Sequence, residues 1–125
     1  MNFEEFNRSK IGSLNELRVL LLFRASPGLD WDVPGISGKL YLRPAEAQAA
    51  VTALAGNDLL VPAEKPQHYR YQPKSEELAR LVEQLVEVDR NHPVTLIHMI
   101  YDRTRDIQAF ADAFRLKKEN GEKGS

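Results

Sequence analysis

The sequence contains no cysteine, carries almost no net charge and has no long apolar run. The absence of cysteine excludes a disulfide framework, a thiolate metal site and a cysteine nucleophile, and it fits a reducing compartment. No stretch reaches the length that spans a membrane, and the first ten residues lack the apolar core of a signal peptide. We therefore expect a cytoplasmic protein with no membrane contact.

The 17 basic and 18 acidic side chains leave a net charge of −1 at neutral pH. Residues 1–62 contain 6 basic and 7 acidic side chains, and residues 63–125 contain 11 of each. Many nucleic-acid-binding proteins are clearly basic, because contacts with phosphates supply much of their affinity. Any basic surface on this protein must therefore be local.

The length of 125 residues fits one domain. We expect residues 1–12 to be a flexible lead. Ser13 and Glu16 have the spacing of a capping box, which predicts a helix that starts there and stops before Pro27 and Gly28. The apolar residues of this helix cover nearly its whole circumference, which predicts that other elements pack on more than one side of it.

The pattern of residues 13–90 predicts a mainly α domain with a small β-hairpin. A short irregular helix is expected over 33–40, and a regular one over 44–55, with one buried face that comprises Ala47, Ala50, Val51 and Leu54. Residues 59–73 predict the hairpin. We expect Tyr69 and Tyr71 to pack in the core of the hairpin rather than to stack on bases. Ser75 is expected to cap a helix over residues 76–91, with one apolar face formed by Leu78, Leu81, Val82 and Leu85.

Residues 91–118 predict a C-terminal helical extension, capped by Asn91, and residues 119–125 a disordered tail. The extension has more apolar side chains than one helix face needs: Val94, Leu96, Ile97, Met99, Ile100, Tyr101, Ile107, Phe110 and Phe114. We expect these helices to form a homodimer interface. The alternative is a monomer in which they fold back on the helix that starts at residue 13.

The order helix, short helix, helix, hairpin, helix is that of a winged helix-turn-helix domain. The stretches "AEAQAAVTALAGNDLLV" (45–61) and "HYRYQP" (68–73) resemble the winged-helix transcriptional regulators of bacteria, including the MarR-like group. The resemblance implies a winged helix-turn-helix with extra C-terminal helices. It also implies that helix 44–55 enters the major groove of duplex DNA while the hairpin, or wing, contacts the backbone.

The outward face of helix 44–55 carries no positive charge, because it consists of Ala45, Gln48, Ala49 and Thr52. Gln48 can pair with an adenine edge, but the commonest specific contact, arginine to guanine, is missing. Asp58 replaces the glycine that usually precedes the wing strand, and Asn57 is expected to adopt the positive φ. The candidate DNA-binding residues are Lys39, Arg43, Gln48, Thr52, Lys65, His68, Arg70 and Lys74.

Two functions remain open: a transcriptional regulator that binds DNA directly, and a winged-helix protein-interaction module that does not. The wing cations can equally be ordinary solvated side chains, and a solvated position is expected for His68. His92 and His98 are six residues apart, which does not place two metal ligands on one helical face. The sequence contains no nucleophile elbow, phosphate-binding glycine loop or zinc-protease motif, so we expect no enzyme, cofactor or metal site.

Overall fold

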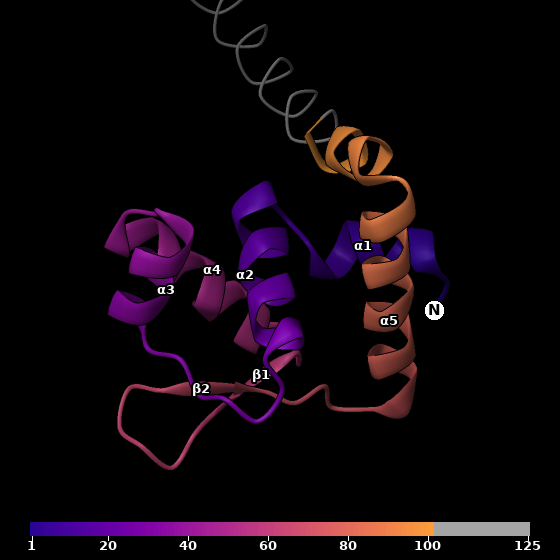
Figure 1. Ribbon diagram of the computed structural model, residues 1–125. Coiled ribbons are helices and arrows are strands. Elements are labelled where there is room, and N and C mark those ends of the chain that lie inside the picture. The colour runs from indigo at the N-terminus through magenta and orange to yellow at the C-terminus, as the bar shows by residue number, and fades with distance from the viewer. Residues whose placement is uncertain (102–125) are drawn as a thin grey trace, which may run out of the picture.

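Helices form most of the computed structural model, which describes residues 1–101, and a small two-stranded antiparallel sheet completes it (Figure 1). The elements are α1 (Phe3–Lys10), α2 (Leu14–Ala25), α3 (Val33–Leu40), α4 (Pro44–Gly56), β1 (Leu60–Pro62), β2 (Tyr69–Tyr71) and α5 (Glu76–Asn91). Residues 93–101 are also helical. The predicted second half of the C-terminal extension and the predicted tail lie outside the described residues. Within residues 1–101, no helix has both the length and the apolar content to cross a membrane.

Helix α2 lies at the centre of the fold, as its continuous apolar surface predicts. It contacts α3 and α4 on one side and β2 on another. Its N-terminus is held by Ser13, whose Oγ accepts a hydrogen bond from the Glu16 N–H at 3.1 Å. The Glu16 carboxylate in turn accepts from the N–H of Gly12 at 2.9 Å, one residue earlier than a capping box requires.

The N-terminal residues are not a flexible lead, so that prediction is wrong. Residues Phe3–Lys10 form α1, which Asn2 caps by accepting from the Glu5 N–H at 2.8 Å. Phe6 and Ile11 are completely buried, and α1 packs against α5. Because burial of one phenylalanine stabilises a fold by about 1.5–3 kcal/mol, two buried apolar anchors are enough to hold this short helix in place.

The predicted buried face of α4 is confirmed, since Ala47, Ala50, Val51 and Leu54 are all buried. The end of α4 differs from the prediction. Asp58, with φ 67°, takes the left-handed conformation, whereas Asn57 has φ −96° and Gly56 is still helical. Asn57 instead makes a contact elsewhere in the chain: its side-chain amide donates to the carbonyl of Lys10 at 3.1 Å, which connects the end of α4 to the end of α1.

The hairpin pairs Leu60 with Tyr71 and Pro62 with Tyr69. Trp31, in the segment before α3, adds an isolated bridge on the other side of β2: its N–H donates to the Tyr69 carbonyl at 2.9 Å, and the Tyr69 N–H donates back at 2.8 Å. Tyr69 and Tyr71 are partly buried against the core, which confirms the core-side interpretation. The hairpin is thus attached to the start of α3 as well as to α2.

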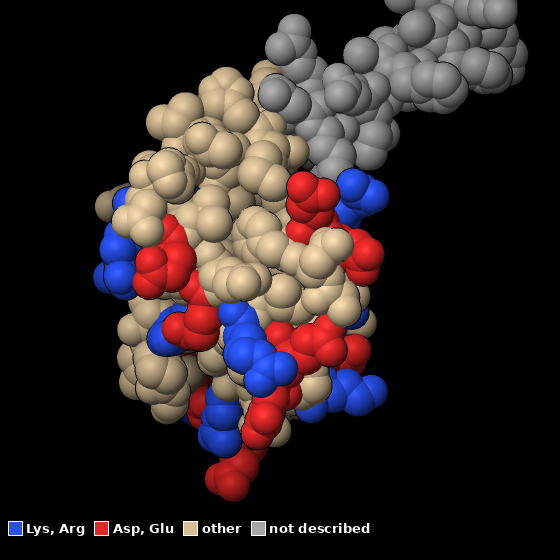
Figure 2. All heavy atoms as spheres, turned by 90° about the vertical axis from the view of Figure 1, so that its right-hand side faces the viewer, with Lys and Arg blue, Asp and Glu red and all other residues tan. Residues whose placement is uncertain are grey.

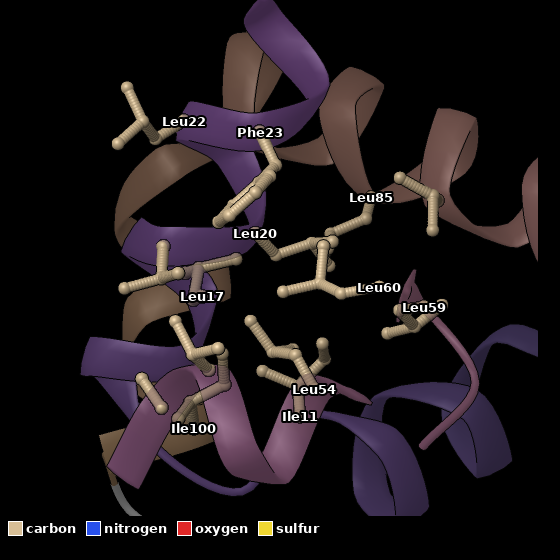
Figure 3. Packing of buried hydrophobic residues seen from close by; sticks show 14 of the residues in the cluster. Ile11, Leu17, Leu20, Leu22, Phe23, Leu54, Leu59, Leu60, Leu85 and Ile100 are labelled. Atoms are coloured by element: carbon tan, nitrogen blue, oxygen red, sulfur yellow. The ribbon is translucent and has the colours of Figure 1, made fainter. Parts of the chain in front are cut away.

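Helix α5 begins at the predicted cap, where the Ser75 Oγ accepts from the Leu78 N–H at 3.1 Å. Its predicted apolar face is buried: Leu78, Leu81, Val82 and Leu85. The helix includes Asn91, so Asn91 is not the cap of the next segment, and the boundary falls at His92. Leucine side chains from α2, α4, β1 and α5 meet in one core with Ile11 and Ile100 (Figure 3).

Candidate nucleic-acid interface

The exposed face of α4, formed by Ala45, Gln48, Ala49 and Thr52, is called the α4 face below. All four residues are exposed, and none is charged. The Gln48 Nε2 donates a hydrogen bond to the Thr52 Oγ1 at 3.1 Å, one helical turn away. This bond fixes the Gln48 amide while leaving its Oε1 acceptor and its second N–H available to a ligand.

A hollow of about 230 Å³ joins the α4 face to the hairpin. Its lining consists of Asp32, Val33, Pro34, Gln48, Gln67 and Tyr69. Gln48 therefore belongs both to the α4 face and to this hollow. The start of α3, the middle of α4 and the hairpin turn form one continuous surface in this way.

Arg70, a predicted DNA contact, is paired with an acid. Its Nε lies 3.0 Å from the Asp30 Oδ1, and the hydrogen bond with Asp30 raises the pKa of the Arg70 guanidinium. The pair connects β2 to the segment that precedes α3. Because the two charges largely cancel, Arg70 offers a phosphate less attraction than an unpaired cation would.

His68 is not in the solvated position that the sequence predicts. Its side chain is 16% exposed, with Nδ1 2.9 Å from the Pro66 carbonyl and Nε2 3.7 Å from the Asp32 Oδ2. Asp32 also caps α3, because its Oδ1 accepts from the Gly35 N–H at 2.8 Å. His68 therefore faces the start of α3 from within the hairpin.

The other predicted cations are exposed and form no ion pair within residues 1–101: Lys39, Arg43, Lys65 and Lys74. Lys39 and Arg43 flank the turn between α3 and α4, and Lys65 lies in the hairpin turn. Lys74 lies apart from these, at the base of the hairpin, where its N–H donates to the Asp58 carbonyl at 2.9 Å. Three of these cations thus lie at the turn before α4 or in the hairpin turn, and none belongs to the α4 face.

The sequence interpretation missed Tyr41, in the turn between α3 and α4, and Arg18, which reaches this turn from α2. Tyr41 is 93% exposed, and an Arg18 guanidinium nitrogen from α2 donates to the Leu40 carbonyl at 2.6 Å. Tyr41 stands between Leu40 and Leu42, both of which turn toward the core, and this pattern could have indicated an outward tyrosine. Arg18 had no local signal, because its partner is 22 residues away.

The described residues contain no group of three or more histidine, aspartate or glutamate side chains arranged to hold a metal ion. Comparison of the chain with protein-family models, with curated proteins and with solved structures gave no match in any of the three. The candidate interface is therefore defined by its own geometry.

Proposed function

We propose that the protein is a winged helix-turn-helix transcriptional regulator that binds duplex DNA, with α4 in the major groove and the hairpin on the backbone. One observation carries the proposal: the α4 face is exposed beside a hairpin that follows it directly in the chain. The bridge between Trp31 and Tyr69 supports the proposal, because it pairs the segment before α3 with the hairpin and so fixes the wing against the helices. In this class of domain the corresponding helix reads base edges.

The α4 face favours A·T base pairs over G·C pairs. The fixed Gln48 amide presents one acceptor and one donor, which match the N6 and N7 positions of adenine. Ala45 and Ala49 are small enough to approach a thymine methyl group. The α4 face has no arginine for guanine, so the protein discriminates between sequences only modestly.

A single copy offers few unpaired cations to the backbone, so we propose that a homodimer is the DNA-binding form. The segment 93–101 buries Leu96 and Ile100 but exposes Val94 (65%), Ile97 (44%) and Tyr101 (51%). Figure 2 shows the side of the molecule that lies on the right in Figure 1. Its upper part, at the height of residues 93–101 in Figure 1, carries no Lys, Arg, Asp or Glu among the described residues. An uncharged apolar face on the C-terminal extension suits self-association.

The dimer has a direct test in the concentration dependence of molar mass. Ile97→Glu places a charge on the exposed apolar face and leaves the core residues intact, so it should convert a dimer to a monomer in light scattering. Gln84→Glu, at an exposed position on α5, is the control for one added negative charge. A wild-type protein that stays monomeric at high micromolar concentration contradicts the dimer and favours folding back of the extension.

DNA binding has its test in electrophoretic retention of mixed-sequence duplexes at low salt. We expect the wild-type chain to retain duplexes and the double variant Arg43→Glu/Lys65→Glu to lose most of the retention. The double variant Arg80→Glu/Arg90→Glu, which makes the same charge change on α5, should keep it. A wild-type chain that retains no duplex at low salt overturns the proposal.

A second candidate function, a protein-interaction module, is favoured by the lack of charge on the α4 face and by the adjoining hollow. In that case a partner helix packs against Ala45 and Ala49. The substitution Ala49→Arg separates the two functions, because it blocks close helix packing but adds a cation next to DNA. If Ala49→Arg loses a protein partner but retains duplex DNA as well as the wild type or better, the α4 face is a protein-binding site.

A further inference from the structure

The turn between α3 and α4 carries an aromatic side chain that the fold does not use. Tyr41 is 93% exposed, the highest exposure among the large apolar side chains of residues 1–101. Its backbone has φ 58° and ψ 41°, in the left-handed region, where any residue with a Cβ atom is disfavoured. Packing therefore gives no reason for a tyrosine at this position, and the backbone would favour a glycine.

Three hydrogen bonds hold the turn around Tyr41. The Tyr41 N–H and the Leu42 N–H both donate to the Ser37 carbonyl, the latter at 3.1 Å, and the Ser37 hydroxyl donates to the Leu42 carbonyl. Leu42 is buried immediately after the turn. The phenol is thus presented from a fixed base, so little conformational freedom of the backbone is lost when a ligand binds it.

Three cations belong to the turn or bond to it. Lys39 and Arg43 lie two residues to either side, both exposed and without an ion pair within residues 1–101. Arg18 brings a third charge from α2, because its bond to the Leu40 carbonyl holds the guanidinium at the end of α3, next to Tyr41. Residues 38–45 contain no acidic side chain. The nearest acid along α4, Glu46, accepts a hydrogen bond from the Arg43 N–H at 2.9 Å.

We propose that Arg18, Lys39, Tyr41 and Arg43, called the turn cluster, form a binding site for a backbone phosphate of nucleic acid, in which the Tyr41 hydroxyl donates a hydrogen bond. Tyrosine, arginine and lysine side chains are typical donors to phosphate oxygens in protein–DNA complexes. The inference rests on the proposed function and extends it. It adds Tyr41 and Arg18 to the interface, and it places the strongest backbone contact at the turn rather than in the hairpin.

The test measures duplex affinity by fluorescence anisotropy over a series of salt concentrations. Tyr41→Phe should weaken binding by about 2- to 10-fold, the effect of one net hydrogen bond. It should leave the salt dependence unchanged, because the phenol carries no charge. Arg18→Gln and Arg43→Gln should each reduce the slope of log K against log salt by about 0.9, the value for one phosphate contact. Arg80→Gln, on α5 at the other side of the molecule in Figure 1, should change neither quantity.

Tyr41→Gly provides a readout that a merely structural role would not give. Glycine adopts φ 58° without strain, so the melting temperature of this variant should equal or exceed that of the wild type. We nevertheless expect it to bind duplex DNA more weakly, because it lacks the phenol. If the wild type binds duplex DNA and both Tyr41 variants bind it equally well, the turn cluster is overturned and the proposed function stands. If the wild type binds no duplex, both the turn cluster and the proposed function are overturned. In that case, loss of a protein partner in Tyr41→Gly would identify Tyr41 as a protein contact.

Discussion

The Nε of Arg70 lies 3.0 Å from the Oδ1 of Asp30, so the central cation of the hairpin is neutralised by a residue 40 positions earlier. This pair fastens β2 to the segment before α3, next to the bridge between Trp31 and Tyr69. It positions the hairpin beside α4, but it also reduces the positive charge that the hairpin offers to DNA. Under the proposed function, the same contact would support the geometry of the candidate interface and limit its affinity for DNA.

Removal of the acid should strengthen DNA binding. We expect Asp30→Asn to leave Arg70 unpaired, to lower the dissociation constant for duplex DNA and to steepen the slope of log K against log salt by about one phosphate contact. Anisotropy titrations at several salt concentrations measure both quantities. Asp89→Asn makes the same charge change on α5, away from the hairpin, and an equal effect of both variants would indicate a general effect of net charge instead.

Sequence preference should depend on the bond between Gln48 and Thr52. Thr52→Val removes the Oγ1 that accepts from the Gln48 Nε2 but keeps a side chain of similar shape. We expect this variant to bind mixed duplexes nearly as well as the wild type, but to lose most of its preference for A·T-rich over G·C-rich sequences. Gln48→Ala should lose the same preference, about 1–3 kcal/mol for each adenine that the amide reads. Competition between duplexes of the two compositions provides the measurement.

The N-terminal helix should be part of the stable fold. Phe6 is completely buried between α1 and the rest of the core, so Phe6→Ala should lower the free energy of unfolding by about 3–5 kcal/mol. Phe6→Leu keeps most of the volume and should cost less than about 1.5 kcal/mol. Urea denaturation followed by circular dichroism checks both values. A flexible N-terminus would leave both variants as stable as the wild type.

Stability should fall at alkaline pH through Tyr71. Burial raises the pKa of this phenol to about 12, from 10.0 in an unfolded chain; the nearby Glu83 adds to the rise, and Arg24 opposes it. Between pH 10 and pH 12 the unfolded chain loses the proton while the folded chain retains it, so unfolding becomes more favourable as the pH rises. The melting temperature of Tyr71→Phe should fall less over this range. Parallel melting curves for the two proteins would exclude Tyr71 as the cause.

The regular helices and the hairpin could be predicted from the sequence because their signals are local. The apolar faces of α4 and α5 repeat at helical spacing, and Ser75 caps α5 as its type suggests. The sequence interpretation failed for α1, whose eight residues contain too few apolar positions to show a period. The contact that packs this helix comes from α5, about 70 residues later in the chain, and leaves no local pattern.

The pairing of charges at the candidate site could not be predicted either, because it also depends on contacts between distant segments. Arg70 and His68 are attractive DNA contacts in a linear sequence, but folding brings each of them to an aspartate in the segment before α3. Conversely, Arg18 reaches the turn between α3 and α4 only because its guanidinium on α2 donates to the Leu40 carbonyl at the end of α3. The residue types of an interface can be found in the sequence, but the pairing of charges depends on contacts between distant segments.

The central claim, that the α4 face and the hairpin meet duplex DNA, is tested most directly by backbone amide chemical shifts recorded during titration with a duplex. We expect the largest changes at residues 41–52 and 63–70, and small changes along the exposed side of α5. Changes confined to α5 and to residues 93–101, or no change at a several-fold excess of duplex at low salt, would contradict the account.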